Sequence, residues 1–239
     1  MSRRRAGRRL LLLALFPLLA LLAPLLARER AADAPLLLRI ATPVPFDPDA
    51  ADLAARLRPP DRIHLLGTDD LGRDVLSRLL HGARVSVAVG FAAAALALAA
   101  GPLLGGAAGA LGRRFDGPIL FVTGVVQAVP ALVLVAAGAA LAPPSAFTAA
   151  ILIALTGWPD VARLVRAESL RLSGAPWVDA ARAAGATRTR VLLVHVLPGA
   201  VAPAAATLPY VLGGAVLLEA SLSFLGLGTP PPHASWGRS

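Results

Sequence analysis

Four predominantly apolar stretches of the sequence lack Asp, Glu, Lys and Arg, and each is long enough to cross a lipid bilayer. In chain order they contain 18, 28, 43 and 28 residues, and they are 10–27, 85–112, 117–159 and 191–218. A transmembrane helix needs about 20 consecutive apolar residues. The stretch of 43 residues is therefore long enough for two helices, which the cluster Pro143–Ser145 should divide because adjacent prolines interrupt helices. The sequence predicts five membrane spans.

Each span is expected to be helical, because the bilayer core cannot satisfy exposed backbone groups. Uninterrupted apolar runs are not typical of the alternating pattern of a membrane β-barrel. The spans are rich in Ala and Gly, among them Gly101, Gly105 and Gly109, and small residues let membrane helices approach closely. We therefore predict an all-α fold, a polytopic membrane helix bundle.

The composition excludes several classes of function. Only 15% of the residues are charged and the mean hydropathy is +0.70, whereas a soluble domain has about 25% charged residues. A soluble enzyme is therefore excluded. The net charge of +9 comes from Arg alone, and beside such long apolar runs it indicates membrane lipid, with no nucleic acid, as the partner. The chain has no Cys and only four dispersed His, so we expect no thiol chemistry, no disulfide and no metal site.

The distribution of Arg predicts the orientation in the membrane, since loops rich in Arg stay in the cytoplasm. Residues 1–9 contain five Arg and no acidic residue, whereas residues 28–83 contain eight Arg and nine acidic residues. The tract 163–190 contains six Arg. These counts predict a cytoplasmic N-terminus, an outer C-terminus and a cytoplasmic tract 163–190. The alternative for residues 10–27 is a cleaved signal peptide, and we expect a retained span.

The long outer segment divides into two parts. Residues 28–63 are rich in Pro and Asp and read as an irregular linker. From His64 the sequence HLLGTDDLGRDVLSRLLHGAR has apolar residues at helical spacing. We expect Thr68 to cap an amphipathic helix that lies on the outer membrane face. The alternative is a plain connector.

The inner tract 168–195 is too polar to span a membrane and too patterned to be disordered. Alanines precede Gly185, and an apolar run that Pro198 closes follows it. We expect two short helices around Gly185. From the residues alone, a docking surface for another protein and a basic loop that only sets the topology are equally supported.

The same tract resembles the EAA loop of membrane subunits in ABC importers. That pattern is Glu-Ala-Ala, three residues, Gly, nine residues, then Ile, any residue and Leu-Pro. This chain keeps both spacings, in Asp179-Ala180-Ala181, Gly185 and the stretch His195–Pro198. Asp stands in place of Glu, and His stands in place of Ile.

Two further stretches extend the resemblance to nearly the whole chain from residue 10 onward. GTDDLGRDVLSR is similar to the segment before the second span in C-type permeases for dipeptides, oligopeptides and nickel. EASLSFLGLGTPPPHASWG is similar to the segment after their fifth span. The resemblance implies the transmembrane domain of a type I ABC importer. Members usually have a sixth span after that stretch, so the notable expectation is a chain truncated before it.

The resemblance also implies the role of single residues. Residues 176–190 would contain the coupling helix, which sits in a groove of a cytoplasmic ATPase. The residues assigned to this coupling are Asp179, Ala180, Ala181, Arg182, Gly185, Arg188, Arg190, Leu197 and Pro198. No residue of this chain would be catalytic, and it would bind no cofactor, because ATP and Mg²⁺ belong to the partner and the chain has no phosphate-binding GxxxxGK[ST] loop.

The expected domain organisation follows the spans. Residues 1–27 form the tail and first span, 28–83 the outer segment, 84–222 the core transmembrane domain with the coupling loop 167–198, and 223–239 an outer C-terminal segment. Glu219 is a candidate for the translocation path, because intramembrane carboxylates are costly; a packing role is the alternative. Asp160 and Arg163 are three residues apart and can pair, or simply end the fourth span.

The implied function is that of a permease subunit in an ATP-driven importer of a bacterial plasma membrane, with peptides as the expected substrates. Its partners would be cytoplasmic ATPase subunits, a second permease subunit and an extracytoplasmic solute-binding protein. Import of nickel or another small solute, a fragment that does not transport, and an intramembrane hydrolase are the alternatives. An intramembrane hydrolase would need an acid, a base and a nucleophile that face the interior of the bundle, and this sequence offers little for those roles.

Overall fold

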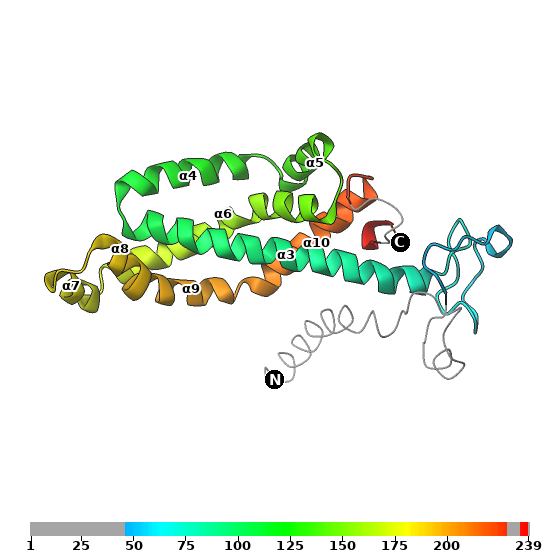
Figure 1. Ribbon diagram of the computed structural model, residues 1–239, viewed down its shortest axis with the longest axis horizontal. Helices are drawn as coiled ribbons and strands as arrows, with labels where there is room; N and C mark the ends of the chain where they lie inside the picture. The colour runs from blue at the N-terminus through cyan, green and yellow to red at the C-terminus, as the bar shows by residue number, and fades with distance from the viewer. Residues whose placement is uncertain (1–45, 229–234, 239) are drawn as a thin grey trace, which may run out of the picture. The chain divides into compact units, whose positions relative to one another are not determined.

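The computed structural model describes residues 46–228 and 235–238, so the predicted span 10–27 lies outside the described residues and stays a prediction. Figure 1 shows that the described part is helical, which agrees with the predicted all-α fold. The principal helices are α3 (Val75–Ala110), α4 (Arg113–Ala128), α5 (Ala131–Leu141), α6 (Ala146–Ser173), α7 (Pro176–Ala183), α8 (Arg188–Arg190), α9 (Leu197–Ala205) and α10 (Leu208–Phe224). Short turns are η2 (Leu53–Ala55), the π-helical η3 (Val191–Val196) and η4 (Trp236–Arg238).

The chain forms two compact units. The first contains residues 46–89, 144–146 and the described residues from 219 onward, and the second contains residues 90–143 and 147–218. Two helices in the described part, α3 and α6, are long and apolar enough to cross a membrane, and the number rises to four if each of two bent helix pairs is one span. These four correspond to the four spans predicted after residue 84.

The predicted helix over residues 117–142 is wrong as a single helix. The chain instead bends by 88° between α4 and α5. Proline provides the reason, because Pro130 has no N–H to continue α4 and disfavours helical geometry at the residue before it. Val129 is accordingly extended, with φ −109° and ψ 136°. The expected division at Pro143–Ser145 is confirmed, since α5 ends at Leu141 and α6 begins at Ala146.

The expected helix that starts at Thr68 is also wrong. The helix begins at Val75, and Asp74 caps it by accepting a hydrogen bond of 2.7 Å from the backbone N–H of Ser77. Thr68 instead accepts a hydrogen bond from the backbone N–H of Arg58 at 2.9 Å. Gly67 and Gly72, with φ of +75° and +74°, form the turns before the helix. No proline lies between Val75 and the predicted span, and the amphipathic stretch is the first part of the 36-residue α3.

In the second unit, glycines of α3 allow a close approach to α6. A Cβ atom added at Gly101 would lie 2.6 Å from Val161 Cβ, and one at Gly105 would lie 2.2 Å from the carbonyl oxygen of Ala162. At Gly109 it would lie 2.6 Å from Ser169 Cβ. No side chain fits at these distances, which confirms the expected use of small residues in helix packing.

The turn η3 has a cause in the sequence. Its last bond joins the N–H of Leu197 to the carbonyl of Leu192, five residues earlier. Pro198 has no N–H and its ring clashes with the carbonyl four residues before it, which disfavours the regular helical hydrogen-bond pattern at this position. The chain then bends again, by 58°, between the stretch Arg188–Ala205 and α10, just before Pro209.

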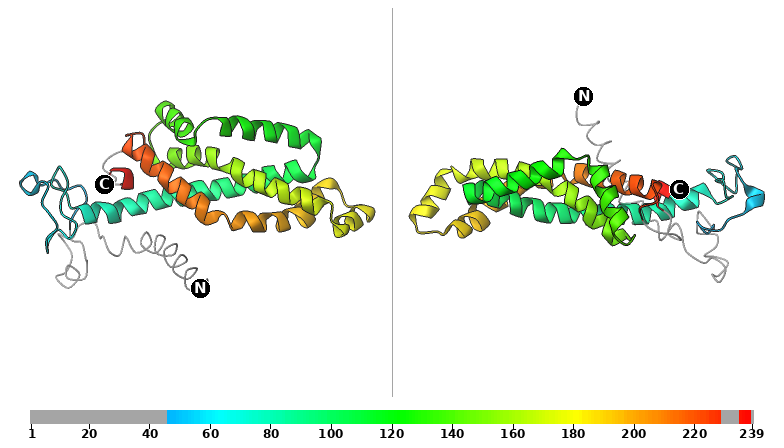
Figure 2. Two further views of the ribbon diagram at one scale, coloured as in Figure 1. Left: turned by 180° about the vertical axis from the view of Figure 1, so that it is seen from behind. Right: turned by 90° about the horizontal axis from the view of Figure 1, so that it is seen from above.

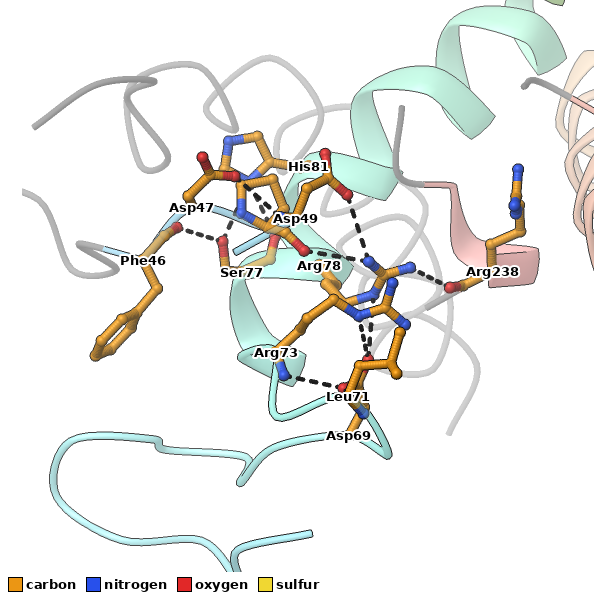
Figure 3. Close-up of polar contacts among 11 residues, drawn as sticks. Phe46, Asp47, Asp49, Asp69, Leu71, Arg73, Ser77, Arg78, His81 and Arg238 are labelled. Atoms are coloured by element: carbon orange, nitrogen blue, oxygen red, sulfur yellow. Dashed lines mark hydrogen bonds and ion pairs between the residues drawn. The ribbon is translucent and has the colours of Figure 1, made fainter. Parts of the chain in front are cut away.

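In the first unit, the start of α3 holds a network of polar contacts (Figure 3). The buried guanidinium of Arg78 donates to the carbonyl of Pro48 at 3.1 Å, pairs with Asp49 at 3.5 Å and contacts the carbonyl of Arg238. Trp236 donates from Nε1 to the carbonyl of Leu79 at 2.9 Å. The two segments that carried the family resemblance at residues 64–84 and 219–237 therefore contact each other, although some 150 residues separate them in the sequence.

Candidate functional site

The helix α7 is the structural counterpart of the predicted coupling helix. It lies at the end of the second unit, beyond the last residues of α6 (Figures 1 and 2). Pro176 occupies its first turn, where its missing N–H has no helical partner in any case. Val178 is fully buried in a cluster with Leu172, Val191 and Val196. One apolar side chain therefore anchors the helix while most of its other residues are exposed.

Gly185 ends this segment in a Schellman motif. The N–H of Ala186 bonds to the carbonyl of Ala181 at 3.0 Å, and that of Gly185 bonds to the carbonyl of Arg182 at 2.9 Å. Gly185 has a φ of +87°, and a Cβ added there would meet nothing within 4 Å. The turn after α7 therefore requires Gly for its backbone conformation and not for space. The two predicted helices around Gly185 are confirmed as α7 and the helical stretch from Arg188.

The predicted polar residues of the segment divide into two groups. Asp179 and Arg182 form an ion pair at 2.9 Å on α7, and Arg182 also donates to the carbonyl of Ser173 at 3.1 Å. Arg188 and Arg190 have exposed side chains, one turn farther along the chain. The predicted polar residues thus lie at one end of the unit. Asp179 and Arg182 form contacts with other groups of the same chain.

The exposed surface here is also apolar, which the sequence pattern alone did not single out. Trp177 on α7 is 54% exposed, and Leu193 and Val194 on η3 are 50% and 58% exposed. We call the exposed residues Trp177 and Ala180 of α7 the α7 surface. Leu197 and Pro198 play another part, since Leu197 packs against the buried cluster and Pro198 shapes the π-turn. Spacing predicted the segment, but only the fold separates its exposed residues from its structural ones.

An ion pair joins α4 and α6 in the same unit. Arg166 Nη2 lies 2.8 Å from Asp116 Oδ2, and a second, shorter contact joins Arg166 Nε to Asp116 Oδ1. This bidentate geometry is the strong form of an Arg–carboxylate contact. Sequence reasoning missed it because 50 residues separate the partners.

The second unit also contains a cavity of about 200 Å³. Residues of α3, α6 and α10 line it, together with Ala131 at the start of α5. Asp160 is one of the lining residues, and its carboxylate pairs with Arg163 at 3.0 Å as the spacing predicted. The helix α6 continues past this pair to Ser173, and the alternative that the pair ends the membrane span stays a prediction.

Glu219 lies in the first unit, and its side chain is fully buried. Ser223 Oγ donates to Glu219 Oε1 at 2.7 Å, one helical turn along α10. Among the described residues, no group hydrogen-bonds to the other carboxylate oxygen. The position of Glu219 on a translocation path stays a prediction.

Comparison with known proteins identifies the family. The family described as "Binding-protein-dependent transport system inner membrane component" matches residues 101–239, which is more than half of the chain. The chain belongs to this family. The match contains α7, the turn at Gly185 and most of the second unit, so the resemblance of the EAA loop is confirmed at the level of the family. The chain is accordingly a multi-pass inner membrane protein with the helical fold of a type I ABC importer domain.

Individual relatives of this transport component agree. A Brucella suis protein whose name describes a peptide transport system permease is 46% identical over 193 residues, which are 80% of this chain and 64% of the relative. The oligopeptide transport system permease protein OppC of Bacillus subtilis is 35% identical over 95% of this chain and 69% of its own length. The di/tripeptide transport system permease protein DppC of Pseudomonas aeruginosa is 38% identical over 81% of this chain and 66% of its own. The chain thus spans about two thirds of the length of these relatives.

Proposed function

We propose that this chain is a membrane-spanning permease subunit of an ATP-driven peptide importer. It couples ATP hydrolysis by a partner ATPase to the movement of substrate, and it carries no catalytic residue of its own. Peptides are the proposed substrates because the similar proteins from Brucella suis, Bacillus subtilis and Pseudomonas aeruginosa are all named for peptide transport. The partners that this function requires are ATPase subunits, a second permease subunit and an extracytoplasmic binding protein.

The single observation that carries the proposal is the construction of α7. Val178 fixes the helix to the unit, Gly185 turns the chain sharply after it, and Trp177 and Ala180 remain exposed. A short helix held in this way can transmit a displacement to the longer helices behind it, because its anchor shares a buried cluster with residues of α6 and α9. The ATPase would bind the α7 surface, with Arg188 and Arg190 beside it.

The orientation of the chain follows from the same proposal. The end of the second unit with α7 carries Arg113, Arg114 and the six Arg of residues 163–190. Arg-rich loops remain in the cytoplasm, so the ATPase would meet α7 there. ATP and Mg²⁺ would be bound by the partner.

Binding of the ATPase subunit to variants of α7 tests the proposal. If Ala180 faces a groove, Ala180→Leu adds volume at a packed contact and costs about 1–3 kcal/mol, which lowers the affinity by roughly one to two orders of magnitude. Ala140→Leu changes an exposed residue of α5 in the same way and should bind as the unchanged chain does. Equal affinity of both variants, with intact membrane insertion, would refute the coupling role of α7.

A further inference from the structure

The cavity of the second unit has a polarity of its own. Most of its lining residues are small or apolar, and those with polar side chains are Thr156, Asp160 and Tyr210. Asp160 is the acidic residue among the described residues that line it. At about 200 Å³ the cavity is smaller than the roughly 300–1,000 Å³ of pockets that enclose a whole drug-sized ligand. It therefore suits one end of a ligand.

The position of Asp160 in α6 makes its charge costly. It lies in the 28-residue helix α6, which is one of the candidate membrane spans, three residues before the tract 163–190 that the Arg distribution predicts to be cytoplasmic. A carboxylate near the end of a span is tolerated where it faces a protein interior or a hydrated path and has a partner. The side chain of Asp160 is 56% exposed, so the other helices of this chain do not enclose it.

The existing partners of Asp160 occupy one oxygen. Oδ1 accepts hydrogen bonds from Gln127 Nε2 at 2.8 Å and from Arg163 Nη2 at 3.0 Å. Within the described ranges, no hydrogen bond or ion pair reaches Oδ2. Gln127 and Arg163 are not lining residues. They therefore hold the carboxylate in place while its second oxygen stays available as an acceptor.

The other polar groups of the lining favour the same kind of ligand. The hydroxyl of Thr156 donates to the carbonyl of Ile153 at 2.9 Å, so toward a further group its oxygen can only accept hydrogen bonds, through its two lone pairs. The ring of Tyr210 adds an aromatic face, which attracts cations. An acceptor, a carboxylate and an aromatic ring together match an ammonium group, which has three N–H donors and a positive charge.

We propose that Asp160 binds the ammonium group at the amino end of the transported peptide. The identification of the ligand as a peptide rests on the proposed function, whereas the preference for an ammonium group rests on the cavity. Asp160 is then a specificity residue near the cytoplasmic end of the fourth span, which holds one end of the substrate while the rest of the peptide lies outside the cavity.

The absence of Cys from the chain allows a direct test on the purified full-length protein. Gly214 lines the cavity and Gly213 does not, and a Cβ at either position would meet nothing within 4 Å. Gly214→Cys therefore places a single thiol in the cavity, and Gly213→Cys is the matched control. Each thiol is treated with a cationic aminoethyl methanethiosulfonate and with its anionic sulfonatoethyl analogue, and the two reaction rates are compared.

For the thiol of Gly214→Cys, we compare the rate with the cationic reagent to the rate with the anionic reagent. We expect this ratio of rates to fall roughly tenfold when Asp160→Asn is added, because a nearby unit charge acts oppositely on the two reagents. Trialanine should slow this reaction, and N-acetyl-trialanine, which lacks the ammonium group, should not. The ratio in Gly213→Cys should be unaffected, which shows that Asp160→Asn is folded. A ratio independent of Asp160, equal protection by both peptides, or a thiol at 214 that reacts with neither reagent would each overturn the proposal.

Transport by the complete importer in vesicles separates this inference from the proposed function. With Asp160→Asn, trialanine transport should fall roughly tenfold to a hundredfold, as the loss of a charged hydrogen bond predicts, and Asp160→Glu should recover part of it. ATP-driven transport of trialanine that Asp160→Asn leaves unchanged would overturn the inference alone. An assembled complex that transports no peptide would refute the proposed function, while the thiol experiment would still decide whether Asp160 selects an ammonium group.

Discussion

Asp116 on α4 and Arg166 on α6 form a bidentate ion pair, with Arg166 Nη2 2.8 Å from Asp116 Oδ2. Both side chains are about three-quarters buried, at 23% and 25% exposure. The loop before α4 contains Gly112 with φ +92°, which reverses the chain after α3 so that α4 can return beside α6. The pair thus joins the first and second halves of the second unit at the level where α6 approaches α7.

We predict that Asp116→Asn and Arg166→Gln each destabilise the protein. Either change leaves one charged group without its partner in a partly buried position, at a cost of about 1–3 kcal/mol. Thermal unfolding in detergent measures the loss. The exchanged double variant Asp116→Arg with Arg166→Asp should recover part of it, and a double variant that is no better than the singles would show that the pair contributes little.

Gly185→Ala should loosen the end of α7. The backbone at φ +87° is strained for any residue with a Cβ, which costs roughly 1 kcal/mol or more. Hydrogen exchange of the amides of Gly185 and Ala186 should accelerate several-fold. Gly174→Ala is the control, because this glycine precedes α7 without a positive φ and its added Cβ would come no closer than 3.9 Å to Arg171. Equal exchange in both variants would contradict the role of the Schellman turn.

Gly105→Ala should disturb the packing of α3 on α6 far more than a Gly→Ala change elsewhere. The new Cβ would lie 2.2 Å from the backbone carbonyl of Ala162, so the helices must separate, and overpacking of this kind costs about 1–3 kcal/mol. Gly124→Ala on α4 meets nothing within 4 Å and should stabilise the helix by about 0.5–1 kcal/mol. The difference in melting temperature between the two variants is the measurement.

The turn before α3 should open in acid. Burial opposes ionisation of Asp69, but the backbone N–H groups of Arg73 and Leu71 and the Arg73 guanidinium outweigh it and hold the pKa of Asp69 below its usual 3.8. A carboxyl with a lowered pKa in the folded state stabilises that state above its unfolded pKa, and the stabilisation disappears as the pH falls through the lower, folded value. Proteolysis or amide exchange of residues 67–74 should therefore increase below about pH 4.

Asp69→Asn should make this turn equally labile at neutral and acidic pH, because the pH-dependent contribution is gone. Asp70→Asn changes the neighbouring exposed carboxylate and should keep the acid transition. An acid transition that survives in Asp69→Asn would assign it to another group.

The orientation of the chain can be tested with single cysteines, because the chain contains none. With a cytoplasmic α7, Ala184→Cys should react with a membrane-impermeant thiol reagent only in inside-out vesicles, and Pro144→Cys only in right-side-out vesicles. The opposite result would reverse the topology and move the proposed ATPase contact to Pro143–Ser145.

Much of the architecture was predictable from local features. Uncharged runs determine where helices can enter lipid, so four spans after residue 84 and the division at Pro143–Ser145 followed directly. The alanines before Gly185 and the apolar run after it predicted two short helices around this glycine, and the structure has them. Each of these features acts over a few residues, through backbone conformation or a missing N–H, and the sequence contains them explicitly.

Local features were insufficient where two groups competed for one role. Thr68 and Asp74 are both good helix caps, and the outcome depends on Arg58, whose backbone N–H engages Thr68. Pro130 was visible in the sequence, but the 88° bend between α4 and α5 is known only from the structure.

The sequence by itself determined that this protein is a helical membrane protein of the family of binding-protein-dependent transport system inner membrane components, because hydropathy and motif spacing are properties of consecutive residues. Only the tertiary structure decided which distant residues meet. It paired Asp116 with Arg166, brought Gly105 against Ala162, and placed Asp160 at a cavity that residues of α3 and α10 complete. Such contacts depend on which helix faces pack together, and that choice is made by the shapes and charges of several segments at once.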